Sequence, residues 1–396
     1  MSLDVAIASY GETPVSRCRK DKGELILTAE QYLSWAAKLT LDKVGLTIRD
    51  LDGQGLAISG PLVQVSELWT GEIAEVLGAS PKILIRSDHA GASAPMLITQ
   101  ATQQIRSGLV DMVLCLGGGA RIWEEGMMFS PHQFGYEFER PFGMDGPNTK
   151  FGMVARRHFD LYGTKPESLG KLAVTQRLHA SLNPNAYLKQ PITMKDYLDS
   201  KIICDPLRML DCSIVVDGGA GFLIASAKKA KELTDNPVSL KGFGTAINYR
   251  EKSDVSPDIL VTGVKPASRT AFEMSGLKPK DVSIVHCYDD YSIMALIQLE
   301  DAGFCEKGKG GKFIEETDLS YRGRLPFNTS GGLLSAGQLP AAGSFTGVIE
   351  VVRQLKGEAG ARQVKDARTG FMSSFGGGSY DLHLINTAAI VFGSES

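Results

Sequence analysis

One short segment of the chain combines the side chains that move protons. HCYDDYS (286–292) places Tyr288, Asp289, Asp290 and Tyr291 directly after an apolar run. Such a run is typical of a buried strand, and α/β folds bind ligands at the carboxyl ends of their strands. A phenol beside carboxylates suits acid–base chemistry if a neighbour shares the proton of the tyrosine, whose ordinary pKa is about 10. We therefore predict that Tyr288 and Asp290 are catalytic.

Two further segments add candidate acid–base groups. SDHAG contains His89, and GGGSYDLH near the end of the chain contains Tyr380. Imidazole is the side chain whose ordinary pKa lies closest to neutrality, so it exchanges protons readily. We predict His89 and Tyr380 as further catalytic residues, with His89 or Asp290 sharing the proton of Tyr288.

Each of these residues also has a purely structural interpretation. Tyr288 would pack where a strand meets a helix, and Asp289 would cap the helix that follows it. His286, on the apolar strand, is interpreted as a hydrogen-bonded core histidine. Cys287 is expected to face away from Tyr288, because successive side chains of a strand point to opposite faces.

A second chemical feature is the turn NTSGGLLSAGQLPAAGSF (328–345), which is almost free of large side chains. Gln338 is the sizeable polar residue at its apex. An amide does not hold or move a proton, but it donates N–H hydrogen bonds to an oxygen that becomes negatively charged. We predict Gln338 as such a donor. The small residues near it and in the last glycine run are predicted substrate contacts: Ser335, Gly337, Gly376 and Gly377.

The cysteines do not suggest a metal site or a nucleophile. The chain has six of them, without the spacing of a metal site. None precedes a predicted helix closely enough for the helix to lower the pKa of the thiol. We therefore expect no metal and no bound cofactor. The positions are Cys18, Cys115, Cys204, Cys212, Cys287 and Cys305.

The elements that must position these residues follow one plan twice. A helical pattern, a strand, a glycine-rich turn that opens a helix and a strand that ends in three glycines occur in the same order in both parts of the chain. This repetition predicts an α/β duplication with a mostly parallel sheet in each half. The matching segments are 45–51 with 276–282, 87–108 with 330–357, and 110–119 with 369–379.

A long insertion interrupts the first copy of the plan. Residues 120–212 are rich in aromatic residues and proline at their start, and such insertions commonly form lids over a site. We predict an N-terminal half (1–233) that contains this loop domain, and a C-terminal half (234–396). Within the first half, Thr28 and Gln31 form a capping-box pattern that predicts a helix near 29–44.

The composition excludes several classes of partner. The chain has 396 residues, 43% of them hydrophobic, and a formal net charge of −3. This balance gives no electrostatic reason to expect nucleic acid or an anionic membrane as a partner. No apolar run is long enough to span a bilayer. We expect a cytoplasmic protein without a membrane span.

Long stretches of the sequence resemble the thiolase superfamily, and within it the sterol-carrier-protein type of thiolase-like protein. They include YGTKPESLGKLAV, LIQLEDAGFCEKGKGG and GRLPFNTSGGLLSAG. The resemblance implies a thiolase fold, in which two βαβαβαββ halves form a five-layered αβαβα arrangement with a loop domain over the active site. It also implies a homodimer and coenzyme A thioester substrates.

The resemblance further implies four catalytic positions, and this chain carries another residue at each. Gly91 stands at the position of the nucleophilic cysteine, and Tyr288 at that of an asparagine or histidine. Gln338 stands at the position of the activating histidine, and Ser374 near that of the cysteine that moves the α-proton. A site with neither thiolate nor imidazole should not carry out the acyl transfer of a thiolase.

Some thiolase-like proteins of sterol side-chain breakdown lack the nucleophilic cysteine and act as retro-aldolases on β-hydroxyacyl thioesters, and this sequence resembles them. We predict the same reaction here, on a sterol or lipid side chain and without a covalent intermediate. Two alternatives stay open: a non-catalytic or partner-dependent subunit of an acyltransferase complex, and acetyl-CoA acetyltransferase-type acyl transfer. Because such relatives commonly pair with a small OB-fold protein, we also expect a partner of that kind.

Overall fold

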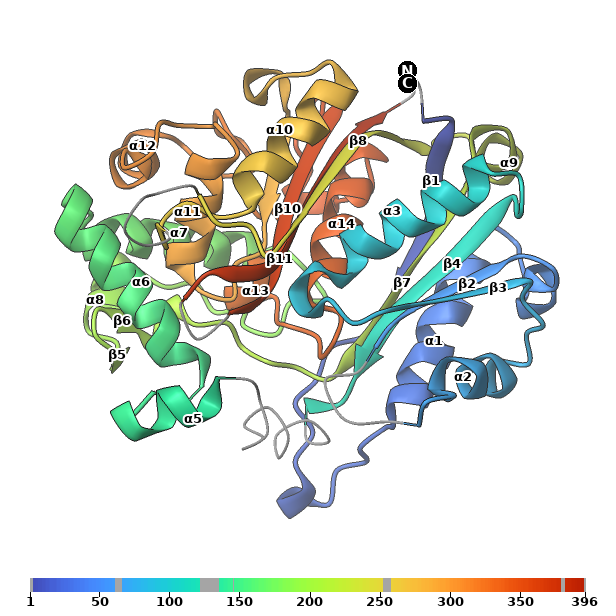
Figure 1. The fold of residues 1–396 in the computed structure, drawn as a ribbon, viewed down its shortest axis with the longest axis horizontal. Coiled ribbons are helices and arrows are strands. Elements are labelled where there is room, and N and C mark those ends of the chain that lie inside the picture. The colour runs from blue at the N-terminus through green and yellow to red at the C-terminus, as the bar shows by residue number, and fades with distance from the viewer. Residues whose placement is uncertain are drawn as a thin grey trace.

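A computed structural model describes residues 3–60, 66–121, 135–144, 146–251, 258–378 and 382–394. Nine of its strands form one sheet (Figure 1). They are β1 (Val5–Glu12), β2 (Gly55–Ser59), β3 (Ile83–Ser87), β4 (Met112–Gly119), β7 (Gly218–Ser226), β8 (Val238–Ile247), β9 (Ile284–Cys287), β10 (Thr369–Gly378) and β11 (Leu384–Ser394). Their order across the sheet is β3-β2-β4-β7-β1-β8-β11-β10-β9.

The strand order shows the internal duplication. The series β2-β4-β7-β1 of the first half is repeated as β9-β10-β11-β8 in the second, and the two series meet where β1 pairs with β8. At the place that corresponds to β3, the second half has an isolated parallel bridge between Val285 and Phe327. Each half therefore presents the end of an equivalent central strand, β4 or β10, beside an equivalent glycine turn.

The prediction of mostly parallel sheets is wrong. Among the described strands, three neighbouring pairs are parallel (β2–β3, β2–β4 and β9–β10) and five are antiparallel (β1–β7, β4–β7, β1–β8, β8–β11 and β10–β11). Parallel neighbours require a crossover, which α2 (Trp69–Leu77) and α3 (Ser93–Arg106) supply around β3. The chain instead enters β7 and β11 from the end of the sheet where the preceding strand stopped, so these strands run antiparallel.

Helices and half-sheets form five layers. The outer helices α1 (Ala29–Asp42) and α2 cover one face of the first half-sheet. On its other face, α3 and α14 (Gly343–Leu355) share one apolar core with strands from both halves. The outer helices α10 (Val264–Ser275) and α11 (Ser292–Asp301) cover the far side of the second half-sheet. Successive residues of one strand, such as Ile284 and Val285, therefore face different cores.

The first helix begins as its sequence pattern predicts. The Thr28 hydroxyl accepts a hydrogen bond from the Gln31 backbone N–H at 3.3 Å, and the Gln31 side chain accepts one from the Thr28 N–H at 2.8 Å. This capping box satisfies two of the backbone donors that a helix N-terminus otherwise leaves unpaired. The helix ends at Asp42, two residues before the predicted end.

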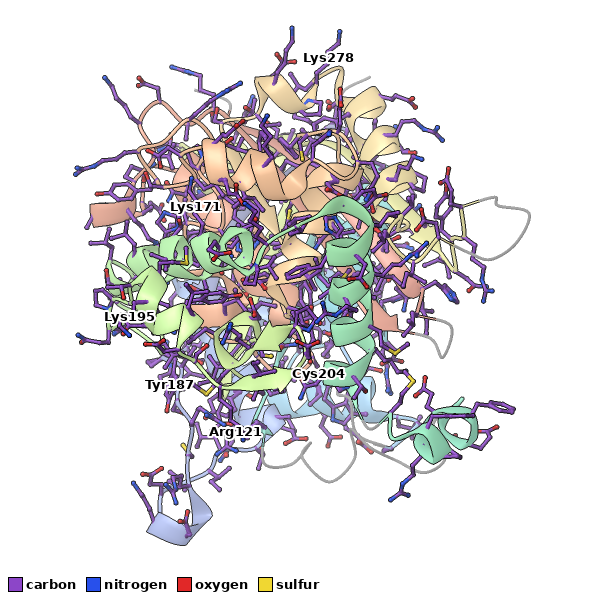
Figure 2. All side chains as sticks on the ribbon, turned by 90° about the vertical axis from the view of Figure 1, so that its left-hand side faces the viewer. Arg121, Lys171, Tyr187, Lys195, Cys204 and Lys278 are labelled. Carbon is purple, nitrogen blue, oxygen red and sulfur yellow. The ribbon has the colours of Figure 1, made fainter. Side chains whose placement is uncertain are left out.

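The insertion forms a group of helices beside the C-terminal half. Its elements are α5 (Tyr136–Glu139), α6 (Pro147–Tyr162), α7 (Pro166–Ser181), α8 (Met194–Leu198) and a small hairpin of β5 (Ile202–Cys204) and β6 (Leu207–Arg208). Figure 2 faces this side of the molecule, where Lys171 marks α7, Lys195 marks α8 and Cys204 marks β5. From here on, the name loop domain, predicted for 120–212, means the described residues 135–144 and 146–216, which include the segment that leads back to β7. The division of the chain at residue 233 stays a prediction.

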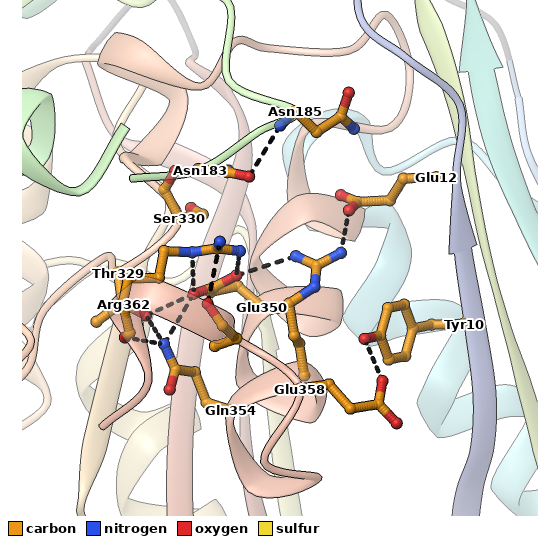
Figure 3. Close-up of polar contacts among 12 residues, drawn as sticks. Tyr10, Glu12, Asn183, Asn185, Thr329, Ser330, Glu350, Gln354, Glu358 and Arg362 are labelled. Atoms are coloured by element: carbon orange, nitrogen blue, oxygen red, sulfur yellow. Dashed lines mark hydrogen bonds and ion pairs between the residues drawn. The ribbon is translucent and has the colours of Figure 1, made fainter. Parts of the chain in front are cut away.

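A buried carboxylate ties the central layer together. Glu350, on α14, accepts hydrogen bonds from Arg362 Nη2 at 2.8 Å, Arg353 Nη1 at 3.0 Å and the Thr329 hydroxyl at 2.8 Å (Figure 3). Arg353 also forms an ion pair with Glu12 of β1. Burial alone would raise the pKa of Glu350, but the two guanidinium groups lower it to about 2. This network fixes α14 and the start of the glycine turn at residue 329 to β1.

None of the helices in the described part of the chain is both long and apolar enough to cross a membrane.

We expect Glu350→Gln to lower the free energy of unfolding at pH 7 by about 3–5 kcal/mol, because it leaves the buried Arg362 guanidinium and the partly buried Arg353 guanidinium facing a neutral amide. The contribution of Glu350 is complete above its ordinary pKa of 4.5 and is lost as the pH falls toward its folded value of about 2. Urea unfolding should therefore show a difference between wild type and variant that narrows as the pH is lowered from 5 to 3.

The matched control is Glu316→Gln, which removes an exposed carboxylate 3.7 Å from Lys312. It should change the stability by no more than about 0.5 kcal/mol. A Glu350→Gln effect as small as that of the control would contradict the assigned role.

Candidate active site

A cavity of about 400 Å³ lies where the ends of β9 and β10, the two glycine turns and the loop domain meet. A larger groove, of about 650 Å³, lies on the outer side of α10 and is lined by none of the predicted site residues. The smaller cavity is lined by predicted site residues, Tyr288, Asp290 and Gln338 among them, so we treat it as the candidate active site. Its polar lining includes Glu139, Asn148, Lys150, Cys212, Ser213, Tyr288, Asp290, Tyr291 and Gln338.

The structure brings together six of the predicted residues at this cavity. They are Gly91, Tyr288, Asp290, Gln338, Gly376 and Gly377. His89, Ser335, Gly337 and Ser374 are not among the residues that line it. Tyr380 lies outside the described residues, so its predicted role stays a prediction.

The turn from β9 to α11 presents Tyr288 to the cavity. The strand ends at Cys287 and the helix begins at Ser292, so the residues between them form a tight strand-to-helix connection. The backbone N–H of Tyr288 donates to the Ser373 carbonyl at 3.0 Å, and its carbonyl accepts from Gln298 Nε2 at 2.6 Å. Both backbone groups of Tyr288 are thus held by buried partners, which fixes where its side chain starts.

The ring of Tyr288 fills the space between the two glycine turns. A Cβ atom at residue 91 would lie 2.5 Å from Tyr288 Cζ and would also overlap the Phe375 carbonyl oxygen. A Cβ atom at Gly343 would lie 2.9 Å from the Tyr288 hydroxyl. The Phe375 ring meets the tyrosine edge-on, with ring centroids 5.2 Å apart. No side chain fits at residue 91 while Tyr288 holds this position.

The Tyr288 hydroxyl belongs to a chain of hydrogen bonds. Gln338 Nε2 donates to it at 2.8 Å, and the Ser213 hydroxyl donates to Gln338 Oε1 at 2.5 Å. Burial raises the pKa of Tyr288 well above 10, and the hydrogen bond from Gln338 only partly opposes this effect. The phenol is therefore neutral at physiological pH, and its own proton is available to a partner in the cavity.

The two aspartates beside Tyr288 have different environments. Asp290 lines the cavity, and its Oδ1 atom has no hydrogen-bond partner among the described residues. Burial and the nearby Asp289 raise the pKa of Asp290 well above its ordinary value. When it ionises, Asp290 is thus a stronger base than an exposed aspartate.

Asp289 has a structural role, but not for the helix predicted from the sequence. Its carboxylate accepts hydrogen bonds from the backbone N–H groups of Leu333 at 2.9 Å and Leu334 at 3.3 Å. It therefore caps α13 (Gly332–Ser335), in the glycine turn, instead of α11, which follows it in the chain. Burial raises the pKa of Asp289 to about 7.

The predicted residues outside the cavity lining have other partners. The His89 ring nitrogen Nδ1 lies 2.8 Å from the Ser87 hydroxyl, and burial lowers the pKa of the imidazole. The Ser335 hydroxyl accepts from Arg177 Nε at 2.9 Å. Ser374 is fully buried in β10. A side chain at Gly337 would meet Val216, so this glycine allows the turn to pack closely.

The loop domain contributes polar groups that the sequence patterns did not indicate. Lys150 Nζ lies 2.7 Å from Glu139 Oε1 and donates to the Gly378 carbonyl at 3.2 Å. Asn148 Oδ1 accepts from the Tyr291 hydroxyl at 2.6 Å. These residues are scattered over helices of the insertion, so neither a motif nor a regular spacing marks them. Lys150, at least, was detectable as a charge near the start of an amphipathic helix.

Among the residues that the structure describes, one thiol lines the cavity and no metal site accompanies it. Cys212 contributes to the lining, but burial raises the pKa of its thiol to about 12. Little thiolate therefore exists at neutral pH. Cys287 is fully buried and is not among the residues that line the cavity. The described residues contain no cluster of histidine, cysteine and acidic side chains that suits a metal ion.

The comparisons with known proteins agree with this architecture. A family model for the thiolase C-terminal domain-like region matches residues 244–386. An acetyl-CoA acetyltransferase of Methanothermobacter thermautotrophicus is 32% identical over 395 residues, covering 97% of this chain and 99% of the relative. The five-layered architecture with its duplicated halves is thus a thiolase fold. The chain belongs to the thiolase superfamily.

Two further similar proteins are named as a lyase and an aldolase. A 17-hydroxy-3-oxo-4-pregnene-20-carboxyl-CoA lyase of Mycobacterium tuberculosis is 30% identical over 380 residues, covering 90% of this chain and 92% of the relative. A solved structure named "Ltp2-ChsH2(DUF35) aldolase" superposes with a TM-score of 0.85 at 27% identity, covering 100% of this chain and 98% of that chain. The relatives are therefore enzymes of both kinds, acyltransferases and lyases.

We expect Gly91→Ala to destabilise the protein by about 1–3 kcal/mol, because the added methyl group overlaps the Tyr288 ring and the Phe375 carbonyl. Gly71→Ala is the matched control, since a Cβ atom there meets nothing within 4 Å and the residue lies inside α2. Urea unfolding should show a loss for the first variant and an unchanged or higher stability for the second. Equal behaviour of the two variants would show that residue 91 has room for a side chain.

Proposed function

We propose that this protein cleaves the Cα–Cβ bond of a β-hydroxyacyl-CoA thioester in a retro-aldol reaction, without a cysteine nucleophile. The observation that carries the proposal is the Tyr288 ring packed against Gly91, which leaves no room for a nucleophilic side chain and places a neutral phenol in the cavity. The lyase relative and the aldolase structure, which share most of their length with this chain, support the same reaction.

In the first step, the Asp290 carboxylate takes the proton of the substrate's β-hydroxyl group. The O–H electron pair becomes the second bond of a carbonyl group at the β-carbon, and the Cα–Cβ pair moves into the thioester as an enolate. Asp290 suits this role because its raised pKa makes the ionised form a strong base. Its Oδ1 atom is buried and has no hydrogen-bond partner among the described residues, so a substrate hydroxyl bound in the cavity would supply the partner that it lacks.

In the second step, the enolate oxygen needs hydrogen-bond donors and its α-carbon needs a proton. Tyr288 supplies the proton, because its phenol is neutral and its hydroxyl oxygen accepts a hydrogen bond from the Gln338 amide, which leaves the phenolic O–H free to donate. The Gln338 amide has a second N–H, which we assign to the thioester oxygen. Donors held in place before the reaction stabilise the developing charge without reorganisation. The proton on Asp290 then returns to the tyrosinate.

We propose a substrate from the sterol or lipid side-chain class, with coenzyme A as part of the substrate and no further cofactor. The name of the Mycobacterium tuberculosis relative, a pregnene carboxyl-CoA lyase, supports this class. The name of the aldolase structure pairs two proteins, so we also propose that a partner protein completes the active form. Self-association into a homodimer, as in the resemblance described above, is part of the same proposal.

Acyl transfer is the second candidate function. Two observations favour it: the Cys212 thiol lines the cavity, and the acetyltransferase relative matches nearly the whole chain. The raised pKa of Cys212 argues against it, because acyl transfer to a thiol needs the thiolate.

Tyr288→Phe should lower kcat for carbon–carbon cleavage by about 10²–10⁴-fold, because it removes the proton donor and keeps the ring. The assay follows the shortened acyl-CoA by chromatography and the released ketone or aldehyde by mass spectrometry. Tyr187→Phe, which changes a half-exposed tyrosine of the loop domain, is the control and should leave kcat unchanged (Figure 2). Full activity of Tyr288→Phe would remove the proposed proton donor.

The pH dependence should report the base. Since the pKa of Asp290 is raised well above 3.8, the value of kcat/KM should fall on the acid side at a pH well above the range of ordinary aspartates. Asp290→Asn should abolish this acid limb, the fall of kcat/KM at low pH, together with most of the activity. An acid limb at the ordinary aspartate pKa, or one that survives in Asp290→Asn, would assign the base to another residue.

A further inference from the structure

The segment that returns from the loop domain to β7 touches both sides of the catalytic turn. The Ser213 backbone N–H donates to the Asp290 carbonyl at 2.8 Å. The next residues pair with the glycine turn: Gln338 N–H donates to the Ile214 carbonyl at 2.8 Å, and Val216 N–H donates to the Gln338 carbonyl at 3.0 Å. Ser213 is therefore held between the strand-to-helix turn of Tyr288 and the turn of Gln338.

A buried carboxylate fixes the approach of this segment. Asp211 accepts hydrogen bonds from the Tyr197 hydroxyl at 2.9 Å and the Arg208 backbone N–H at 2.7 Å. It also accepts from the hydroxyl of Ser292, the first residue of α11. Because α11 starts just after Tyr288 and Asp290, Asp211 joins the segment that carries Ser213 to the element that positions the catalytic pair.

The distances along the hydrogen-bond chain define its direction. The contact between Ser213 Oγ and Gln338 is 2.5 Å, at the short end of the O–H···O range and below the N–H···O range. The contact between Gln338 and the Tyr288 hydroxyl is 2.8 Å, within the ordinary N–H···O range. The amide oxygen therefore faces the serine and the amide nitrogen faces the tyrosine, so every group in the chain donates toward the cavity.

We propose that Ser213 is a positioning residue that holds the Gln338 amide in this orientation and so makes Tyr288 a proton donor to the substrate. The proposal rests on the proposed function for the identity of the proton acceptor, the α-carbon of the thioester enolate. Without the serine hydroxyl, the amide is free to turn over. Its oxygen would then face Tyr288 and accept the phenolic proton, which would no longer point to the substrate.

The hydrogen bonds from Ser213 through Gln338 to Tyr288 act cooperatively, because each one polarises the next. A phenol that receives an N–H bond is a better donor, since the same bond stabilises the phenolate that forms when the proton leaves. Ser213 thus influences the reaction through two successive hydrogen bonds, to Gln338 and from Gln338 to Tyr288, without contact with the reacting atoms.

The kinetic test compares three variants of the full chain with any partner present. Ser213→Ala should lower kcat for cleavage of a β-hydroxyacyl-CoA by about tenfold with little change in KM, as expected for one lost transition-state hydrogen bond. Ser213→Thr keeps the hydroxyl and should restore most of kcat. Ser200→Ala is the control, because its hydroxyl donates only to the Tyr197 carbonyl, at 2.7 Å in the same domain.

The second readout does not depend on turnover. With 3-fluorotyrosine incorporated at position 288, ¹⁹F NMR follows the titration of this phenol alone, and fluorination brings the titration to a lower pH. Ser213→Ala should raise the titration midpoint by about one pH unit, because the phenolate would face the amide oxygen instead of the N–H group. Ser213→Thr and Ser200→Ala should leave the midpoint unchanged.

The two readouts separate this inference from the proposed function. A raised midpoint supports the positioning role even if the wild type cleaves no β-hydroxyacyl-CoA, a result that would refute the proposed reaction alone. An unchanged midpoint in Ser213→Ala would overturn the positioning role. The same holds for a loss of kcat that Ser213→Thr does not restore, because it would show a structural effect of the substitution.

Discussion

The contact of one aromatic ring with two glycines governs this active site. Tyr288 lies between Gly91 and Gly343, the residues through which the chain enters the two central helices. The thiolase fold brings these turns to the end of β9 by repeating one plan of strands and helices, so the ring is clamped by equivalent turns of both halves. A larger residue at position 91 and a tyrosine at position 288 exclude each other. This exclusion separates the proposed chemistry from that of a thiol-dependent acyltransferase.

Desolvation makes the remaining groups useful for proton transfer. The loop domain covers the ends of β9 and β10 and buries Tyr288 and Asp290, which raises the pKa of both. A neutral phenol and a carboxyl group of raised pKa form an acid–base pair of the kind that retro-aldol cleavage needs. The Glu350 network holds the site in place, since it fixes α14 and the glycine turn that positions the Gln338 amide.

Local patterns in the sequence predicted much of this arrangement. The capping box at Thr28 and the repeated glycine turns specify elements directly, because short-range geometry decides them. Tyr288, Asp290 and Gln338 were predicted together because all three follow strand ends or glycine turns that a duplicated fold brings to one place. The predicted strand directions were wrong. The direction of a strand depends on the end of the sheet at which the chain re-enters, and no local sequence pattern specifies that end.

The tertiary contacts of single side chains could not be predicted from the sequence either. Asp289 caps α13 instead of its sequence neighbour α11, since the fold brings the N–H groups of Leu333 and Leu334 closer. Ser213 is an ordinary serine in the sequence, and its contact with Gln338 spans 125 residues. Contacts at such separations follow from the packing of the loop domain on the second half and have no local signature.

Intact-protein mass spectrometry during turnover is the most direct test of the central claim, that a site without a thiol nucleophile cleaves the Cα–Cβ bond of a β-hydroxyacyl-CoA by acid–base chemistry. Purified protein, with its partner if one copurifies, is mixed with a β-hydroxyacyl-CoA and quenched in acid at millisecond to second intervals. The account predicts that the ketone or aldehyde product accumulates while the mass of the protein stays unchanged. A transient gain equal to the acyl group, located on a cysteine such as Cys212, would contradict it.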